Sequence, residues 1–141
     1  MPVTNYQATA YKQTKVKTAG PGQLVVLLYD EAIRQLQIAT ELLQQNSKQL
    51  DQVNNAILKA RDIITELMVS LDLEQGGDFA QSMFSLYMWF NDQLMEANLK
   101  KEAQPLHTIA NHLNQIRDAW AQIVNTTTVV PDERSGINIA G

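Results

Sequence analysis

The stretch LDQVNNAILKARDIITELMVSL, residues 50–71, determines the fold that we expect for this chain. Its apolar side chains recur every three and four residues, which places them on one side of an α-helix and does not match the alternation of a β-strand. A stripe this regular predicts a long helix that packs against other helices. The stripe consists of Leu50, Val53, Ile57, Ala60, Ile64, Leu67 and Leu71.

Three further stretches repeat this spacing. Four stripes of similar length with short connections favour an all-α protein, an antiparallel up-down-up-down four-helix bundle. Each helix is expected to span about 21 to 28 residues, or roughly 30 to 42 Å. The three additional stripes are Val25, Leu28, Ala32, Leu36, Ala39 and Leu43; Ala80, Met83, Tyr87, Phe90, Leu94 and Ala97; and Leu106, Ile109, Leu113, Ile116, Trp120 and Ile123.

Residues that favour helix ends separate these stripes. Proline suits a first helical turn, glycine a helix end, serine and aspartate a cap, and lysine the carboxyl end of a helix. The signals are, in chain order, Pro21 at the start of the first helix, Ser47 as the cap of the second, Gly76 and Gly77 at its end, Asp78 as the cap of the third, Lys100 and Lys101 at its carboxyl end, and Pro105 at the start of the fourth.

Charge divides the chain into parts. Residues 1–17 carry three lysines and no acidic side chain, whereas residues 18–125 carry seven basic and thirteen acidic side chains. We expect an N-terminal arm at 1–17 that can act as a lid, a bundle at 18–125, and a mobile, flexible C-terminal tail at 126–141, which lacks a helical period. The acidic bundle disfavours nucleic acid as a partner, because phosphate binding needs clustered Lys and Arg on a folded face.

The longest unbroken apolar run, residues 24–29, is far shorter than the roughly 20 residues that a membrane-spanning helix needs. No membrane insertion is therefore expected. The start of the chain lacks the layout of a secretion signal, so the cytoplasm is the expected compartment. The sequence contains no cysteine, and the chain can form neither a disulfide nor a thiolate metal site.

A four-helix bundle suggests a di-iron carboxylate site, which needs a Glu-x-x-His pair on each of two helices. The sequence lacks this pair, because Gln104 and Ile109 stand three residues before His107 and His112. The two histidines are about 140° apart around a helix and are badly placed to share a metal. No pairing of a nucleophile with a base and no phosphate-binding loop is recognisable. We expect no catalytic residue, no metal, no cofactor and no enzyme activity.

Apolar side chains outside the stripes are the main functional signal. They form a second group on the third expected helix and another on the first. Such residues either widen the buried arc of a helix or form a surface groove, and flexible methionines favour a groove for a partner helix. The candidate partner-binding residues are Leu24, Leu27, Ile38 and Leu42 on the first helix, and Phe84, Met88, Met95 and Leu99 on the third.

The N-terminal arm has the chemistry of a lid for such a groove. Tyr6, Tyr11 and Val16 are spaced apolar residues on an otherwise polar and basic segment. A basic arm beside an acidic bundle with spare apolar surface can dock there reversibly. The alternative interpretation is a frayed terminus.

Short segments in a fixed order and spacing form a recognisable pattern. They are Tyr11-Lys12-Gln13 with Val16, Thr18-Ala19-Gly20-Pro21, Leu27-Leu28-Tyr29-Asp30-Glu31-Ala32-Ile33-Arg34, Lys59-Ala60-Arg61-Asp62-Ile63-Ile64, Ser70-Leu71-Asp72, Gly76-Gly77, Leu86-Tyr87, Ala97-Asn98 and Arg117-Asp118-Ala119-Trp120. In this pattern the sequence resembles the FliS family of flagellin export chaperones over most of residues 6–120. The family commonly has Ser in place of Gly20 and Gly in place of Glu31, which leaves open the contacts at that turn of the first helix.

The resemblance implies an antiparallel four-helix bundle that binds the disordered C-terminal region of flagellin in the cytosol. Such binding prevents premature polymerisation and keeps flagellin competent for export. The resemblance also implies contact with the cytosolic part of the flagellar export gate and an N-terminal arm that covers part of the flagellin site. We hypothesise that a flagellin segment displaces the arm and lays amphipathic turns on the candidate residues.

Two other classes of function stay open. An enzyme built on a bundle would need a bound metal or cofactor. A self-associating structural bundle would bury the same apolar side chains against copies of itself.

Overall fold

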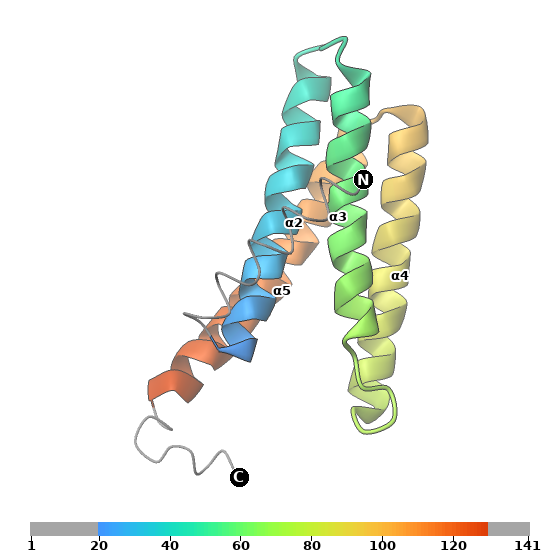
Figure 1. Cartoon of the computed structure of the whole chain (residues 1–141). Helices are drawn as coiled ribbons and strands as arrows, with labels where there is room; N and C mark the ends of the chain where they lie inside the picture. Colours follow the sequence, from blue (N-terminus) through green and yellow to red (C-terminus); the bar gives the residue numbers. More distant parts are fainter. Residues whose placement is uncertain (1–19, 130–141) are drawn as a thin grey trace. The chain divides into compact units, whose positions relative to one another are not determined.

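The computed structural model describes residues 20–129, and this part of the chain contains four α-helices and no strand (Figure 1). The all-α fold class with four helices is thereby confirmed. The helices are α2 (Pro21–Gln44), α3 (Leu50–Val69), α4 (Gly77–Lys100) and α5 (Ala103–Val129).

The chain divides into two compact units. The larger unit spans Leu28–Gln115 and contains α3, α4 and most of α2. Within the described residues, the smaller unit combines residues 20–27 with residues 116–129. The two units share α2 and α5.

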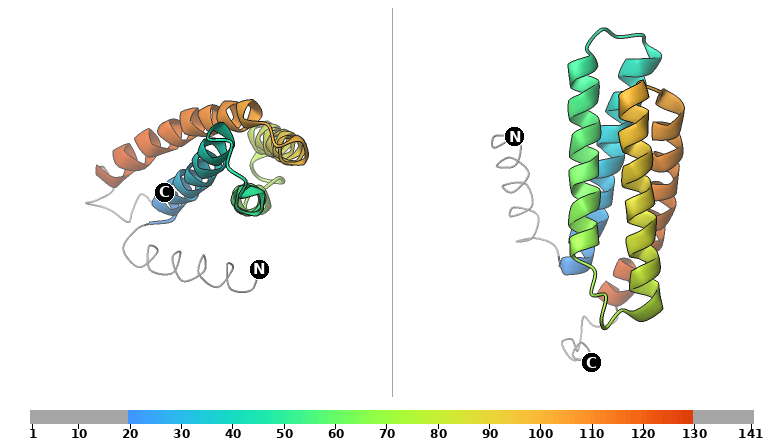
Figure 2. Two further views of the ribbon diagram at one scale, coloured as in Figure 1. Left: turned by 90° about the horizontal axis from the view of Figure 1, so that it is seen from above. Right: turned by 90° about the vertical axis from the view of Figure 1, so that its right-hand side faces the viewer.

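Within the larger unit the chain direction alternates from one helix to the next, and α3 and α4 lie side by side and antiparallel (Figures 1 and 2). The hydroxyls of Tyr29 on α2 and Tyr87 on α4 form a buried hydrogen bond. The ring of His112 on α5 stacks on Phe90 of α4, with ring centroids 6.0 Å apart. The helix α4 therefore contacts each of the other three helices of this unit.

The core of the larger unit consists mainly of the predicted stripes. Leu28 of the first stripe is only half-buried and Tyr29 is fully buried instead, because its hydroxyl reaches Tyr87 on α4. Leu50, at the start of the α3 stripe, is exposed. The buried apolar residues of this unit are Tyr29, Ala32, Leu36, Ala39, Val53, Ala56, Ile57, Ala60, Ile64, Leu67, Ala80, Tyr87, Phe90, Leu94, Ala97, Leu106, Ile109, Ala110 and Leu113.

The turn after α2 is closed by a residue in the left-handed region. Asn46 has a φ of 55°, and the N–H of Ser47 donates to the carbonyl of Leu42 at 3.0 Å. This is the hydrogen bond of a Schellman motif, in which Asn is tolerated at the left-handed position. The prediction that Ser47 caps α3 is wrong. Its hydroxyl accepts a hydrogen bond from the N–H of Gln49, the residue at the cap, two positions later in the chain.

The two glycines between α3 and α4 belong to the start of α4, so the prediction that they end the preceding helix is wrong. The helix α3 ends at Val69, and the N–H of Gly76 donates to the carbonyl of Asp72 at 2.7 Å. A Cβ on Gly76 would lie 2.6 Å from that oxygen and 2.5 Å from the Cβ of Ala80. Gly77 has a φ of 60°, which favours glycine. The tight turn at the start of α4 therefore requires both Gly76 and Gly77.

The remaining end signals lie close to their predicted positions. Asp78 is in the first turn of α4 and not at its cap, and Lys100 is in the last turn. Lys101 ends α4 in the left-handed region with a φ of 53°, and its ammonium donates to the backbone oxygen of Asn98 at 2.7 Å. Pro105 is in the first turn of α5, where its missing N–H removes no intrahelical hydrogen bond.

In the smaller unit, the first turns of α2 contact the last turns of α5. A Cβ on Gly22 would lie 2.9 Å from Cγ2 of Val124, so the two helices approach closely at this glycine. Val26 is buried, Trp120 is half-buried and Ile123 is exposed. The predicted stripe of the last helix is therefore only partly covered in this unit.

The helix α5 continues to Val129 and extends four residues into the segment 126–141 that the sequence assigned to a tail. Helix propagation adds one hydrogen bond per residue once a helix exists, which offsets the modest helix propensity of β-branched residues. The rest of the predicted tail and the predicted arm at residues 1–17 lie outside the described residues.

Candidate partner-binding surface

The second apolar group on α4 is largely exposed. Met88 and Met95 expose 46% and 44% of their surface, and Leu99 exposes 80%. Phe84 is half-buried. The core stripe of the same helix lies roughly 90 to 150° away around the helix, so the fold of the larger unit leaves these side chains at or near the surface.

This group on α4 borders α3. Nδ2 of Asn91 on α4 donates a hydrogen bond to Oγ1 of Thr65 on α3 at 3.2 Å. Met88 precedes Asn91 by three residues and Met95 follows it by four, which places both about 40 to 60° further around α4, away from the core. The exposed methionines therefore lie just outside the contact between α3 and α4.

The contact between α3 and α4 is partly polar. Asn98 is buried and donates to Oδ1 of Asn54 at 2.7 Å, and it accepts a hydrogen bond from Nζ of Lys101 at 2.8 Å. Nε of Arg61 and Oδ1 of Asn91 are buried and have no hydrogen-bond partner among the described residues. Buried polar pairs favour one register of two helices over others, because a shifted register would leave them unsatisfied.

The four predicted residues on α2 fall in both units. Ile38 and Leu42 belong to the larger unit, and Leu24 and Leu27 belong to the smaller unit. All four are half-buried. Their partial burial is compatible with both interpretations of the sequence, a wide buried arc and the edge of a groove.

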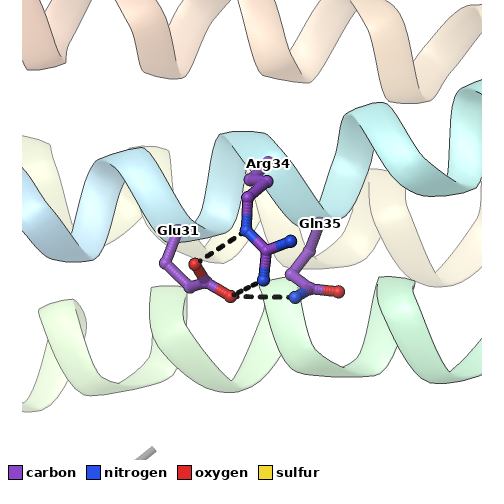
Figure 3. A network of polar contacts seen from close by, with 3 residues as sticks. All are labelled: Glu31, Arg34 and Gln35. Carbon is purple, nitrogen blue, oxygen red and sulfur yellow. Dashed lines mark hydrogen bonds and ion pairs between the residues drawn. The ribbon is translucent and has the colours of Figure 1, made fainter. Parts of the chain in front are cut away.

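A charge network occupies the side of α2 that faces α3 (Figure 3). Nε of Arg34 donates to Oε1 of Glu31 at 3.0 Å, Nη2 of Arg34 donates to Oε2 at 2.8 Å, and Nε2 of Gln35 donates to the same Oε2 at 2.9 Å. Burial alone would raise the pKa of Glu31. The hydrogen bonds from Arg34 and Gln35 and the attraction of Arg34 and Lys59 outweigh burial and lower this pKa. These are the contacts that the sequence left open.

The position of this network shows where the predicted α2 residues lie. Glu31 interacts with Lys59 of α3, so this side of α2 is turned to α3. Ile38 and Leu42 follow Glu31 by seven and eleven residues and return to within about 20° of it around the helix. One apolar group therefore borders α3 from α2, and the other borders it from α4.

The outward side of α3 between these groups is acidic. Lys59, three residues before Asp62, interacts with α2, and Thr65, three residues after Asp62, contacts α4. Asp62 therefore lies midway between the two neighbours, and Asp51 and Glu66 lie within about 40° of it. All three acids are exposed. We call this surface the α3 face; it comprises Ile38, Leu42, Asp51, Asp62, Glu66, Phe84, Met88, Met95 and Leu99.

The structure exposes apolar residues that the sequence analysis did not select. Trp89 is 44% exposed, its ring is tilted on Phe90, and it lies edge-on to His112 with centroids 6.1 Å apart. A large aromatic residue outside the predicted stripe was the signal that could have identified it. The other large apolar residues exposed in the larger unit are Leu50, Val69, Leu73 and Phe79, at or near helix ends.

The three predicted lid residues, Tyr6, Tyr11 and Val16, lie outside the described residues. Within residues 20–129, no group of three His, Asp or Glu side chains could hold a metal ion. His107 and His112 are both exposed. None of the described helices is both long enough and apolar enough to cross a membrane.

Exposed apolar side chains along one flank of a helix, with half-buried ones along the other, are typical of a protein-binding module. Comparison with known proteins supports this class. A family model described as flagellar protein FliS matches residues 3–127. The chain therefore belongs to the FliS family, and this membership supports a role as an export chaperone.

Three relatives named flagellar secretion chaperone FliS illustrate the match. The Salmonella typhimurium protein is 34% identical over 119 residues, which cover 81% of this chain and 87% of the relative. The Vibrio cholerae protein is 32% identical over 118 residues, covering 81% and 85%. The Bacillus subtilis protein is 29% identical over 118 residues, covering 84% and 86%. The similarity therefore extends over most of each chain.

Proposed function

We propose that this chain is a cytosolic export chaperone that binds the disordered C-terminal region of flagellin. Bound flagellin cannot polymerise prematurely and stays competent for export. The observation that carries this proposal is the exposure of Met88, Met95 and Leu99 beside α3, on a bundle whose core is filled without them. The relatives named flagellar secretion chaperone support the flagellar context.

The chaperone acts by binding and catalyses no reaction. Methionine side chains are flexible and polarizable, so they adapt to the irregular apolar surface of a segment that folds as it binds. Ordering such a segment costs several kcal/mol, typically about 2 to 5, and a large apolar contact has to offset this cost. The half-buried Ile38 and Leu42 on the other flank of α3 extend the contact area.

The N-terminal arm is the lid of this surface in the free chaperone. Tyr6, Tyr11 and Val16 supply apolar contacts, and the three lysines of residues 1–17 complement the acidic side of α3. Flagellin displaces the arm when it binds. The cytosolic part of the flagellar export gate is the second partner, because cargo that is held for export has to be delivered there.

The decisive experiment is copurification of this chain with full-length flagellin and with flagellin that lacks its C-terminal segment. We expect a stoichiometric complex with the full-length protein and none with the truncated one. Equal recovery of both would contradict the proposed segment, and recovery of neither would contradict the proposed partner. Sedimentation of the chain alone at several concentrations tests the alternative, because a self-associating bundle would form larger species as concentration rises.

A further inference from the structure

We propose that the α3 face selects a substrate segment in which basic residues stand between two apolar groups. This inference rests on the proposed function and specifies the chemistry of the segment that is bound. The apolar groups of the segment would lie on Ile38 and Leu42 at one flank and on Met88, Met95 and Leu99 at the other. The basic residues would lie over the outward side of α3.

The arrangement of the face imposes this order on its occupant. The two apolar groups belong to different helices, and α3 separates them. A segment that contacts both therefore has to cross the outward side of α3, where Asp51, Asp62 and Glu66 are exposed. An apolar side chain placed beside any one of these carboxylates would desolvate a charge, whereas Lys or Arg would gain a favourable charge interaction.

Acidic side chains also stand at the rim of each apolar group. Glu41 is exposed on α2 between Ile38 and Leu42 in the sequence. Asp92 is exposed on α4 between Met88 and Met95. The occupant therefore meets acidic groups on each of the three helices that form the face.

Lys59 and Arg61, the basic residues nearest to Asp62 in the sequence, are engaged elsewhere. Arg34 donates two hydrogen bonds to Glu31, and Lys59 attracts the same carboxylate. Arg61 is half-buried, and its Nε is buried. Exposed acidic side chains therefore outnumber exposed basic ones on a surface that also carries exposed and half-buried apolar side chains. This combination favours a cationic amphipathic partner over a neutral or acidic one.

The chain itself contains a segment with this chemistry. Residues 1–17 combine Tyr6, Tyr11 and Val16 with three lysines and no acid. A substrate that displaces such an arm competes best when it offers the same combination of apolar and basic side chains. Charge complementarity thus points to one kind of occupant, a basic amphipathic segment of the exported protein.

The test measures binding of flagellin from the same organism to the full chain at 50 mM and 500 mM NaCl. The test variant is Asp62→Asn/Asp92→Asn, which removes two carboxylates from the face and its rim. The matched control is Glu74→Gln/Glu102→Gln, which removes two exposed carboxylates from the turns at either end of α4. Both variants change the net charge equally, so a difference in Kd between them shows the effect of the position of the carboxylates and not of the total charge.

At 50 mM NaCl we expect the test variant to raise the Kd for flagellin about three- to tenfold and the control to raise it less than about twofold. At 500 mM NaCl the two should differ less than about twofold, because salt screens exposed charges. Equal binding by both variants at 50 mM would overturn this inference and leave the proposed function intact. A loss that persists at 500 mM would also overturn it, because the cause would not be charge. Failure of the unmodified chain to bind flagellin would refute the proposed function itself, and this inference with it.

Discussion

Met88 and Met95 show how much the role of a residue depends on its angle around a helix. Both stand on α4 close to Tyr87 and Leu94, which are buried, yet both are nearly half exposed. A shift of one position in the sequence turns a side chain by about 100°. The proposed binding function therefore rests on side chains that can be changed without removing any residue of the core.

Replacement of Met88 or Met95 by Glu should weaken flagellin binding about tenfold or more, because a carboxylate would be desolvated in the apolar contact. The free energy of unfolding should change by less than about 0.5 kcal/mol, as for most surface substitutions. Titration calorimetry and thermal unfolding measure the two quantities. Ser82→Glu is the matched control, because Ser82 is exposed on α4 about 120° around the helix from Met88. A large loss of stability in the methionine variants would show that these residues belong to the core.

Glu31 should make the stability of the chain depend on pH in acid. Its pKa is lowered in the folded state, so the charged form stabilises the fold above the ordinary value of 4.5, and this contribution is lost as the pH falls through the folded value. Glu31→Gln should flatten the decline of the melting temperature below about pH 4.5. Glu41 is an exposed neighbour on α2, and the melting temperature of the Glu41→Gln variant should decline with pH as that of the unmodified chain does. The same decline in all three proteins would show that the network with Arg34 and Gln35 does not stabilise the fold.

At the scale of elements, the turn between α3 and α4 sets the position of α4, which carries the exposed methionines, beside α3. The carbonyl of Asp72 accepts a hydrogen bond from the N–H of Gly76, and Oδ1 of Asp72 accepts one from the N–H of Gln75 at 3.0 Å. The hydrogen bonds of Asn91 and Asn98 to α3 then hold the two helices in one register. The turn and these side chains together position the flank of the α3 face.

Gly76→Ala should destabilise the chain by about 1 to 3 kcal/mol, because the added Cβ would lie 2.5 Å from the Cβ of Ala80 and 2.6 Å from a backbone oxygen, and neither neighbour is a flexible side-chain end. Gly20→Ala is the control. A Cβ there meets nothing within 4 Å, so the substitution should cost only the weaker capping by alanine, less than about 1 kcal/mol. Urea unfolding of both variants measures the difference. If the two substitutions cost the same, the close approach at Gly76 does not constrain the turn.

At the scale of the whole molecule, the proposed regulation depends on competition between the arm and flagellin for one surface. If the arm covers the surface most of the time, the apparent affinity falls by the fraction of molecules that are open. The release of the arm then becomes part of the free energy of binding. Competition of this kind would keep the exposed methionines from binding unrelated proteins.

Deletion of residues 1–17 should therefore lower the Kd for flagellin several-fold, and the gain should equal the inverse of the open fraction. Fluorescence anisotropy with labelled flagellin measures this change. Deletion of residues 130–141, a segment of similar length at the other end of the chain, should leave the Kd unchanged. Unchanged or weaker binding after the first deletion would contradict the lid.

The four helices and most of their buried faces could be predicted from the sequence, because helical periodicity is a property of consecutive residues. Val53, Ile57 and Ile64 are buried in the structure as their spacing predicts. The helix ends were harder to predict. Gly76 can end one helix or begin the next, and the hydrogen bond that its carbonyl accepts from the N–H of Ala80 places it at the start of α4.

The sequence by itself determined the fold class and the set of surplus apolar residues on two helices. The tertiary structure alone decided that Met88, Met95 and Leu99 are exposed whereas Phe84 and Ile38 are half-buried. It also placed α3, with its acidic outward side, between the two groups. The physical reason is that periodicity sets the angle of a side chain around its own helix, whereas burial depends on which distant segment covers that angle.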